Sequence, residues 1–276
     1  MTPLSLTLVL LAALLHASWN ALLRGGADRA QSMLVMNVTV GITGILMVVV
    51  AGLPSAASAG YVIASGLIHL VYNALLVRMY RRGDLGETYP VARGSSPALV
   101  ALGASLFAGE WMNAVAAAGI GLVCIGIFML AAKERLRQMD LPWALTTGVV
   151  IATYTVVDGI GVRASGNWAG YIGTMFVFFL AAPLWQLARR RAPIVAMTLP
   201  QAAMATTGGL ISLLAYGAII WAMQSSHMGV VSALRETSVV FAALLGVLFL
   251  GERMTPRRII ACCIIALGAA CVGWTS

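Results

Sequence analysis

The chain has 276 residues, of which 61% are hydrophobic and only 9% carry a charge. Soluble domains are about 25% charged and about 45–50% apolar, so this composition excludes a soluble globular enzyme, a disordered chain and a collagen-like fibre. The net charge of +8 comes from short basic clusters between apolar runs. Such clusters are typical of the cytoplasmic loops of membrane proteins rather than of a nucleic-acid-binding surface.

Ten apolar runs, separated by charges, glycines and prolines, are each long enough for a membrane-spanning helix, which needs about 20 apolar residues. We predict helices over 4–23, 32–52, 59–80, 88–108, 112–132, 142–163, 168–188, 200–222, 228–250 and 257–275. Strands are not expected, because an open sheet edge cannot face lipid and the sequence has no alternating barrel pattern. The predicted fold class is therefore an all-α membrane protein with ten transmembrane helices.

The basic residues predict how these helices are oriented. Fourteen of the 17 Lys and Arg residues follow the first, third, fifth, seventh and ninth helices. Because cytoplasmic loops carry the excess of Lys and Arg, the odd-numbered connections are predicted to be cytoplasmic. An even number of helices then places both termini on the periplasmic side of the membrane.

An internal repeat divides the chain into two halves of five helices, residues 1–138 and 139–276. Arg93 in the first half aligns with Arg235 in the second, at an offset of 142 residues. Because five is an odd number, the second half must cross the membrane in the opposite sense, and the basic loops of the two halves alternate accordingly. Substrate sites of such inverted repeats tend to lie near the midplane, between the halves.

The repeat architecture, the segment "YPVARGSSP" that opens the fourth helix, and the Gly-Glu pairs ending at Glu110 and Glu252 resemble the EamA family. This family belongs to the drug/metabolite transporter (DMT) superfamily. The resemblance implies a multi-pass carrier of the bacterial inner membrane that exports amino acids, as in the aromatic and other amino acid exporters of the YddG type, or related metabolites. "SALRETSVV" in the second half lacks the prolines of "YPVARGSSP", so the ninth helix is expected to move differently.

Polar groups within hydrocarbon are costly, so each one needs a partner or a water-filled cavity. The candidates for lining a substrate cavity are His16, Trp19, Asn20, His69, Tyr72, Asn73, Tyr89, Ser96, Tyr154 and Tyr216. On the third helix, His69, Tyr72 and Asn73 follow the spacing i, i+3, i+4 and therefore share one face. A cavity with aromatic and hydrogen-bonding groups suits a small zwitterion. The alternative is that the His and Asn side chains bond only to neighbouring helices and that Trp19 belongs to an interfacial belt.

Four charged residues lie well inside predicted helices, away from their ends: Arg93, Asp158, Arg235 and Glu236. We expect them in gating or charge pairs, with plain ion pairing or snorkelling as the alternative. Pro90, Gly94 and Pro97 loosen the fourth helix, so we predict that this helix is the hinge for alternating access. The alternative is that the prolines only produce a static kink.

The leading hypothesis is a secondary exporter of amino acids. An exporter of drugs or nucleotide-linked metabolites is the alternative, but a strongly anionic substrate needs more cations than two arginines. A channel is disfavoured by the repeat, and an intramembrane enzyme by three histidines that lie far apart without a nearby acid. We therefore expect no enzymatic activity, catalytic residue, metal or cofactor.

The expected partners are a small-molecule substrate and the lipid bilayer, and no nucleic acid. The protein is expected to be a monomer or a weak homodimer. The absence of a G-x-x-x-x-G-K-[ST] loop argues against ATP hydrolysis, which leaves facilitated diffusion, with proton antiport as the alternative.

Overall fold

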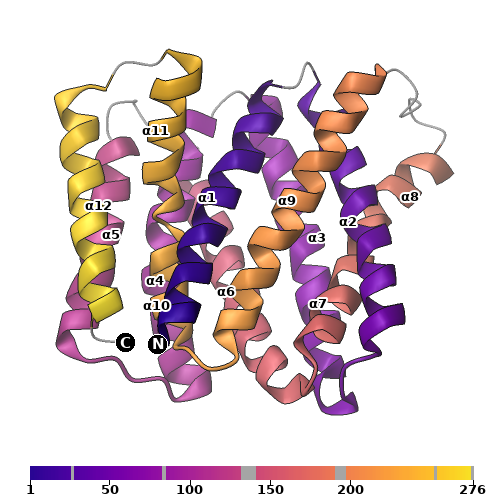
Figure 1. Ribbon diagram of the computed structural model, residues 1–276, viewed down its shortest axis with the longest axis horizontal. Coiled ribbons are helices and arrows are strands. Elements are labelled where there is room, and N and C mark those ends of the chain that lie inside the picture. Colours follow the sequence, from indigo (N-terminus) through magenta and orange to yellow (C-terminus); the bar gives the residue numbers. More distant parts are fainter. Residues whose placement is uncertain (26–27, 83–84, 132–140, 190–196, 252–253, 275–276) are drawn as a thin grey trace.

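The computed structural model describes residues 1–25, 28–82, 85–131, 141–189, 197–251 and 254–274. Within these ranges the chain is helical, with short 3₁₀ turns and no strand. The helices are α1 (Pro3–Gly25), α2 (Arg29–Ala51), α3 (Ala59–Arg82), α4 (Leu85–Ala108), α5 (Ala114–Ala131), α6 (Leu141–Ser165), α7 (Trp168–Val177), α8 (Ala181–Ala188), α9 (Leu199–Met223), α10 (Met228–Arg235), α11 (Ser238–Leu250) and α12 (Pro256–Trp274). Most of them stand side by side in one upright bundle (Figure 1).

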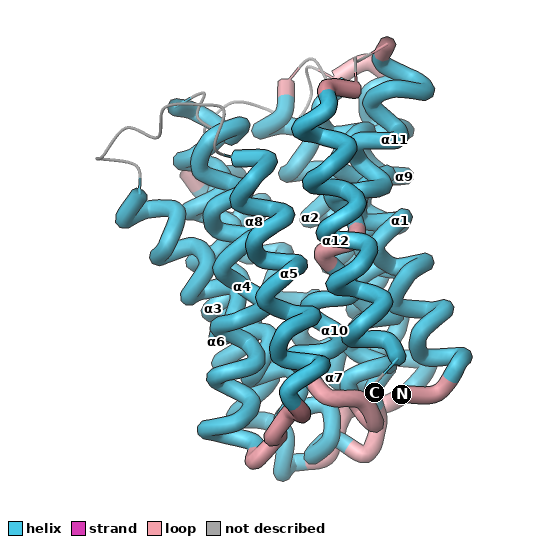
Figure 2. The backbone as a smooth tube through the Cα atoms, turned by 90° about the vertical axis from the view of Figure 1, so that its left-hand side faces the viewer, coloured by secondary structure: helices cyan, strands magenta, loops and turns pink. Residues whose placement is uncertain are grey.

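The predicted all-α membrane fold is confirmed. Within the described ranges, nine helical segments are apolar and long enough to cross a bilayer, and a tenth, Ala114–Leu130, is apolar but shorter. The outside of the bundle is apolar as well, with side chains such as Val50 and Phe249 largely exposed. This surface suits lipid rather than water. Both termini lie at the same end of the bundle, as an even number of spans requires (Figures 1 and 2).

Two of the ten predicted spans are not single α-helices. The span over 168–188 consists of α7, a 3₁₀ turn over Phe178–Leu180, and α8. Pro183 lies in the first turn of α8, where its missing N–H cannot continue the hydrogen bonds of α7, so the preceding turn tightens. The span over 228–250 is divided between α10 and α11 after Arg235.

Helices of the first half pack against helices of the second. α5 packs on α12 and α2 on α7, while α1 packs on α9 and α3 on α6. At the α5–α12 contact, Gly119 and Gly268 lie so close that a Cβ on either one would come within 3 Å of the other's carbonyl oxygen. Small residues are what let membrane helices approach this closely. Residues 132–140 lie outside the described part of the chain, so the repeat boundary at 138/139 stays a prediction.

Candidate functional site

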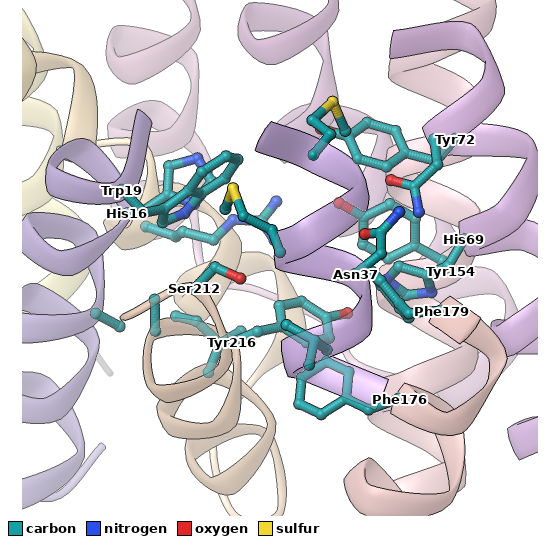
Figure 3. Close-up of a pocket in the computed structure, with 18 of the residues that line it drawn as sticks. His16, Trp19, Asn37, His69, Tyr72, Tyr154, Phe176, Phe179, Ser212 and Tyr216 are labelled. Atoms are coloured by element: carbon teal, nitrogen blue, oxygen red, sulfur yellow. The ribbon is translucent and has the colours of Figure 1, made fainter. Parts of the chain in front are cut away.

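A cavity lies between the two halves of the bundle and has about 120 Å³ available to the centres of water molecules. This exceeds the roughly 10–15 Å³ that one water requires. Nine of the residues predicted for the site line it: His16, Trp19, His69, Tyr72, Asn73, Arg93, Tyr154, Tyr216 and Arg235. Figure 3 shows His16 and Trp19 on one side of the cavity and His69, Tyr72 and Tyr154 on the other.

The aromatic wall consists of His69, Tyr72, Tyr154 and Tyr216. The His69 ring centroid lies 4.2 Å from that of Tyr154 and 5.5 Å from that of Tyr216. The Tyr72 and Tyr154 ring centroids are 5.7 Å apart. His69 Nδ1 lies 2.9 Å from the carbonyl oxygen of Ser65, which fixes the orientation of the imidazole. Aromatic faces held in this way offer a surface on which a cation can bind.

Asp158 lies directly behind the aromatic wall and is fully buried. Tyr216 Oη donates to its Oδ2 at 2.5 Å, and Tyr171 Oη donates to its Oδ1 at 3.0 Å. Among the residues that the structure describes, no Lys, Arg or His forms a salt bridge with this carboxylate. Tyr216, which lines the cavity, thus links the cavity to this buried carboxylate.

The arginine wall consists of Arg93, Arg235 and His16. Arg93 Nε donates to Glu236 Oε2 at 2.7 Å, and its Nη2 donates to Ser238 Oγ at 3.0 Å. These bonds join α4 in the first half to the α10–α11 segment in the second. Arg235 is also buried, with 4% of its side chain exposed, but its Nη2 lies 3.7 Å from Glu236 Oε1. Its Nε and Nη2 have no hydrogen-bond partner within the described ranges.

His16 stands between two groups that can only donate. Arg93 Nη1 lies 3.0 Å from His16 Nε2, and the indole Nε1 of Trp19 lies 3.3 Å from His16 Nδ1. A neutral imidazole accepts through one nitrogen only, because the other nitrogen carries the proton. When His16 accepts from Arg93, the shorter contact, the indole N–H of Trp19 is left to donate to a ligand in the cavity.

Asn20, Ser96 and Glu236 are not among the residues that line the cavity. Asn20 Nδ2 donates to the backbone oxygen of His16 at 2.8 Å. Ser96 is fully buried, and its Oγ has no partner in the described part of the chain. Glu236 supports the arginine wall from behind, as Asp158 supports the aromatic wall. The side chain of Tyr89 lies outside the described residues.

The predicted hinge lies on a helix without interruption. α4 runs through Pro90, Gly94 and Pro97 as one helix. A Cβ on Gly94 would lie 3.3 Å from side-chain atoms of Ile127 and Phe128, so this glycine gives α5 a close approach. The side chain of Pro90 is not described. The hinge role of the three residues stays a prediction.

Sequence reasoning missed part of the lining. Asn37 on α2 and Ser212 on α9 also line the cavity, and both lie within otherwise apolar runs. Asn37 is buried and Ser212 is partly buried. Asn37 carries the same signal as Asn73, a polar side chain within hydrocarbon. Phe176 and Phe179 on the α7 span also line the cavity. Nothing in the sequence separates these two rings from aromatic residues that face lipid.

A second charged cluster, the end clasp, lies at the end of the bundle that carries both termini. Arg163 forms a salt bridge with Glu110 and donates through Nε to the carbonyl oxygen of Met223 at 2.9 Å. Its Nη2 donates to the carbonyl oxygen of Ser226 at 2.9 Å. Glu110 Oε2 also accepts from the backbone N–H of Met228 at 2.7 Å. The end clasp thus ties the α4–α5 connection to α6 and to the α9–α10 connection.

Comparison with known proteins agrees with this architecture. A crystal structure of another protein superposes with a TM-score of 0.77 over 98% of this chain and 96% of that chain, at 17% sequence identity. At this identity the likeness concerns the fold alone. Among curated proteins, no sequence matches this chain. Residues 139–274 match the EamA-like transporter family. Through these residues the chain belongs to the EamA-like transporter family, and it is a multi-pass membrane transporter of the DMT type.

Proposed function

We propose that the protein is a secondary transporter that exports amino acids, or closely related small metabolites, across the bacterial inner membrane. The observation that carries this proposal is the cavity between the two halves, which has a cationic wall facing an aromatic wall with a carboxylate behind it. A transporter needs a site that both halves share, because their relative motion can then expose it to either side in turn.

The positions of the lining residues along α1 and α2 support loading from the cytoplasm. α1 begins at the end of the bundle with the termini, and its cavity residues extend to Trp19, towards the other end. α2 begins at that other end and contributes Met33, four residues after its start. That end carries the basic connections, which the distribution of Lys and Arg assigns to the cytoplasm. The end clasp ties together the elements at the opposite end, which this proposal assigns to the periplasm.

The buried charges favour a small zwitterion over a strongly anionic metabolite. Of the two arginines at the cavity, Arg93 already binds Glu236. A nucleotide-linked substrate would bring more negative charge than one remaining arginine can balance. We propose export driven by the substrate gradient. Proton antiport would require a carboxylate that changes protonation, for which Asp158 is the candidate.

Counterflow in proteoliposomes tests the proposal. Vesicles preloaded with unlabelled amino acids should accumulate the matching labelled amino acid, and the rate should saturate. Ala215→Trp fills the cavity and should abolish counterflow. Leu214→Trp is the matched control, because Leu214 is the neighbouring residue on α9 and faces outward with 58% exposure. Flux that does not saturate, or no counterflow of any amino acid, would overturn the proposal.

A further inference from the structure

We infer that Arg235 is the anchor for the substrate's carboxylate, and that the substrate therefore enters the cavity as an α-amino acid with its carboxylate towards the arginine wall. This inference rests on the proposed function and specifies how the site works. Arg235 lines the cavity, is buried to 4% exposure, and leaves Nε and Nη2 without hydrogen bonds among the described residues.

The first argument is the charge count at the arginine wall. Arg93 and Arg235 bring two positive charges, and Glu236 brings one negative charge. Glu236 gives its short contact of 2.7 Å to Arg93, whereas Arg235 is 3.7 Å away from the other oxygen. A buried charge without a close partner is unfavourable, so one further negative charge is needed at this wall. A monoanion provides it.

The second argument is the excess of hydrogen-bond donors. Nε and Nη2 of Arg235 have no hydrogen-bond partner in the described ranges, and the unpaired Glu236 Oε1 lies 3.7 Å from Nη2, beyond hydrogen-bond distance. The indole N–H of Trp19 is left without an acceptor when His16 accepts from Arg93. A carboxylate fits such a set of donors, because it only accepts and binds guanidinium through short, charge-assisted hydrogen bonds.

The third argument comes from the opposite wall. A carboxylate on Arg235 leaves the other end of a small ligand near the aromatic wall, where Tyr154 and Tyr216 stand in front of Asp158. Aromatic faces and a buried negative charge both favour an ammonium group. The two walls therefore match the dipole of an α-amino acid. A simple amine would leave Arg235 unbalanced, and a dianion would exceed the one charge that is missing.

Competition by amino acids and their amides in proteoliposomes tests this inference. The probes are L-phenylalanine, L-leucine and L-threonine together with L-phenylalaninamide, L-leucinamide and L-threoninamide. At about pH 6, where the α-amino group of an amide is protonated, each amide keeps the ammonium group and the side chain but loses the negative charge. For the amino acid that competes most strongly, the affinity of the wild-type protein for the acid should exceed its affinity for the amide by about 10–150-fold. This is the range expected for a hydrogen bond to a charged group. In Arg235→Gln the acid should lose this advantage while the affinity for the amide is kept.

Arg235→Lys and thermal unfolding provide the controls. Arg235→Lys keeps the charge and should retain part of the preference for the acid. The Tm of Arg235→Gln should equal or exceed that of the wild type, because the variant removes an unbalanced charge, whereas a purely structural arginine would lower it. Wild-type protein that transports acid and amide equally well, or Arg235→Gln that keeps the full preference, overturns the inference alone. If no amino acid competes or is transported by the wild type, the proposed function fails with it.

Discussion

The aligned segments Arg93–Ser96 and Arg235–Ser238 have diverged in the partners of their arginines. Glu236 stands where the first half has Gly94, so the pair of segments contains one carboxylate for two guanidinium groups. That carboxylate reaches across to Arg93, and Ser238 does the same. Ser96, which aligns with Ser238, has no partner in the described part of the chain. After duplication, one arginine, Arg93, thus joins the two halves, whereas the aligned Arg235 is left for the proposed contact with a ligand.

The two segments also differ in helix geometry. α4 is continuous although it contains prolines, whereas the aligned span tightens at Glu236 without any proline. Here the backbone N–H groups of Glu236 and Thr237 donate to Ala233 and Leu234, three residues back, at 3.1 Å each. Short 3₁₀ stretches inside a helix often mark a functional hinge. The helix irregularity next to the cavity thus lies in the second half.

Removal of the shared carboxylate should have the largest effect. Glu236→Gln removes the close negative partner of Arg93 and the more distant one of Arg235, so we expect a loss of about 3–5 kcal/mol in the free energy of unfolding. Thermal or denaturant unfolding of the purified protein in detergent measures it. The double variant Glu236→Gln with Arg93→Gln should lose less than Glu236→Gln alone. If Glu236→Gln were as stable as the wild type, the Arg93–Glu236 ion pair would not contribute to the stability of the fold.

The aligned serines provide a matched pair of substitutions. Ser238→Ala removes an acceptor of Arg93 and should cost about 1.5–3 kcal/mol, as for a hydrogen bond to a charged group. Ser96→Ala removes a hydroxyl that has no partner among the described residues, so its stability should be unchanged or higher. Both variants are compared by unfolding under the same conditions. Equal losses at the two positions would contradict the asymmetry.

The ion pair of the end clasp should stabilise the fold less than the Arg93–Glu236 pair, because its arginine is more exposed. The Arg163 side chain is 31% exposed, against 5% for Arg93. Glu110→Gln should therefore cost only about 1 kcal/mol, which raises the population of the opened end about fivefold. Ser226→Cys, in a background without the native cysteines, reports this opening because Ser226 is buried beside the clasp. Labelling by a polar thiol reagent that is no faster in Glu110→Gln would show that the clasp does not hold this end closed.

A small effect on stability is also expected at Pro97. Pro97→Ala gives the helix an additional backbone N–H, so the free energy of unfolding should change by less than about 1 kcal/mol. If α4 bends during transport, as the sequence predicts, counterflow should nevertheless slow down. Unaltered counterflow would place the bending in the α10–α11 segment instead. Val239→Ala, at the aligned position of the second half, is the control for lost side-chain volume.

Much of the fold follows from the sequence, because the length and apolarity of each run fix where a helix can cross the membrane. Many lining residues were predicted as well, since a polar side chain such as His69 within hydrocarbon must face a cavity or a partner. The pairing of charges could not be predicted. Arg93 lies 143 residues away from Glu236, and yet it binds this carboxylate more closely than Arg235, the neighbour in sequence. Apolar lining residues such as Phe176 carry no signal that distinguishes them from lipid-facing ones.

Substrate protection of a cysteine in the cavity tests the central claim most directly. Ser212→Cys, in a background without the native cysteines, places a thiol in the cavity wall, and Asn113→Cys places one at an exposed position in the α4–α5 connection. At ten times its Kd, a bound amino acid leaves about a tenth of the sites free, so labelling of Ser212→Cys should slow about tenfold while labelling of Asn113→Cys is unaffected. Labelling of Ser212→Cys at the same rate with and without a transported amino acid would show that the substrate passes elsewhere.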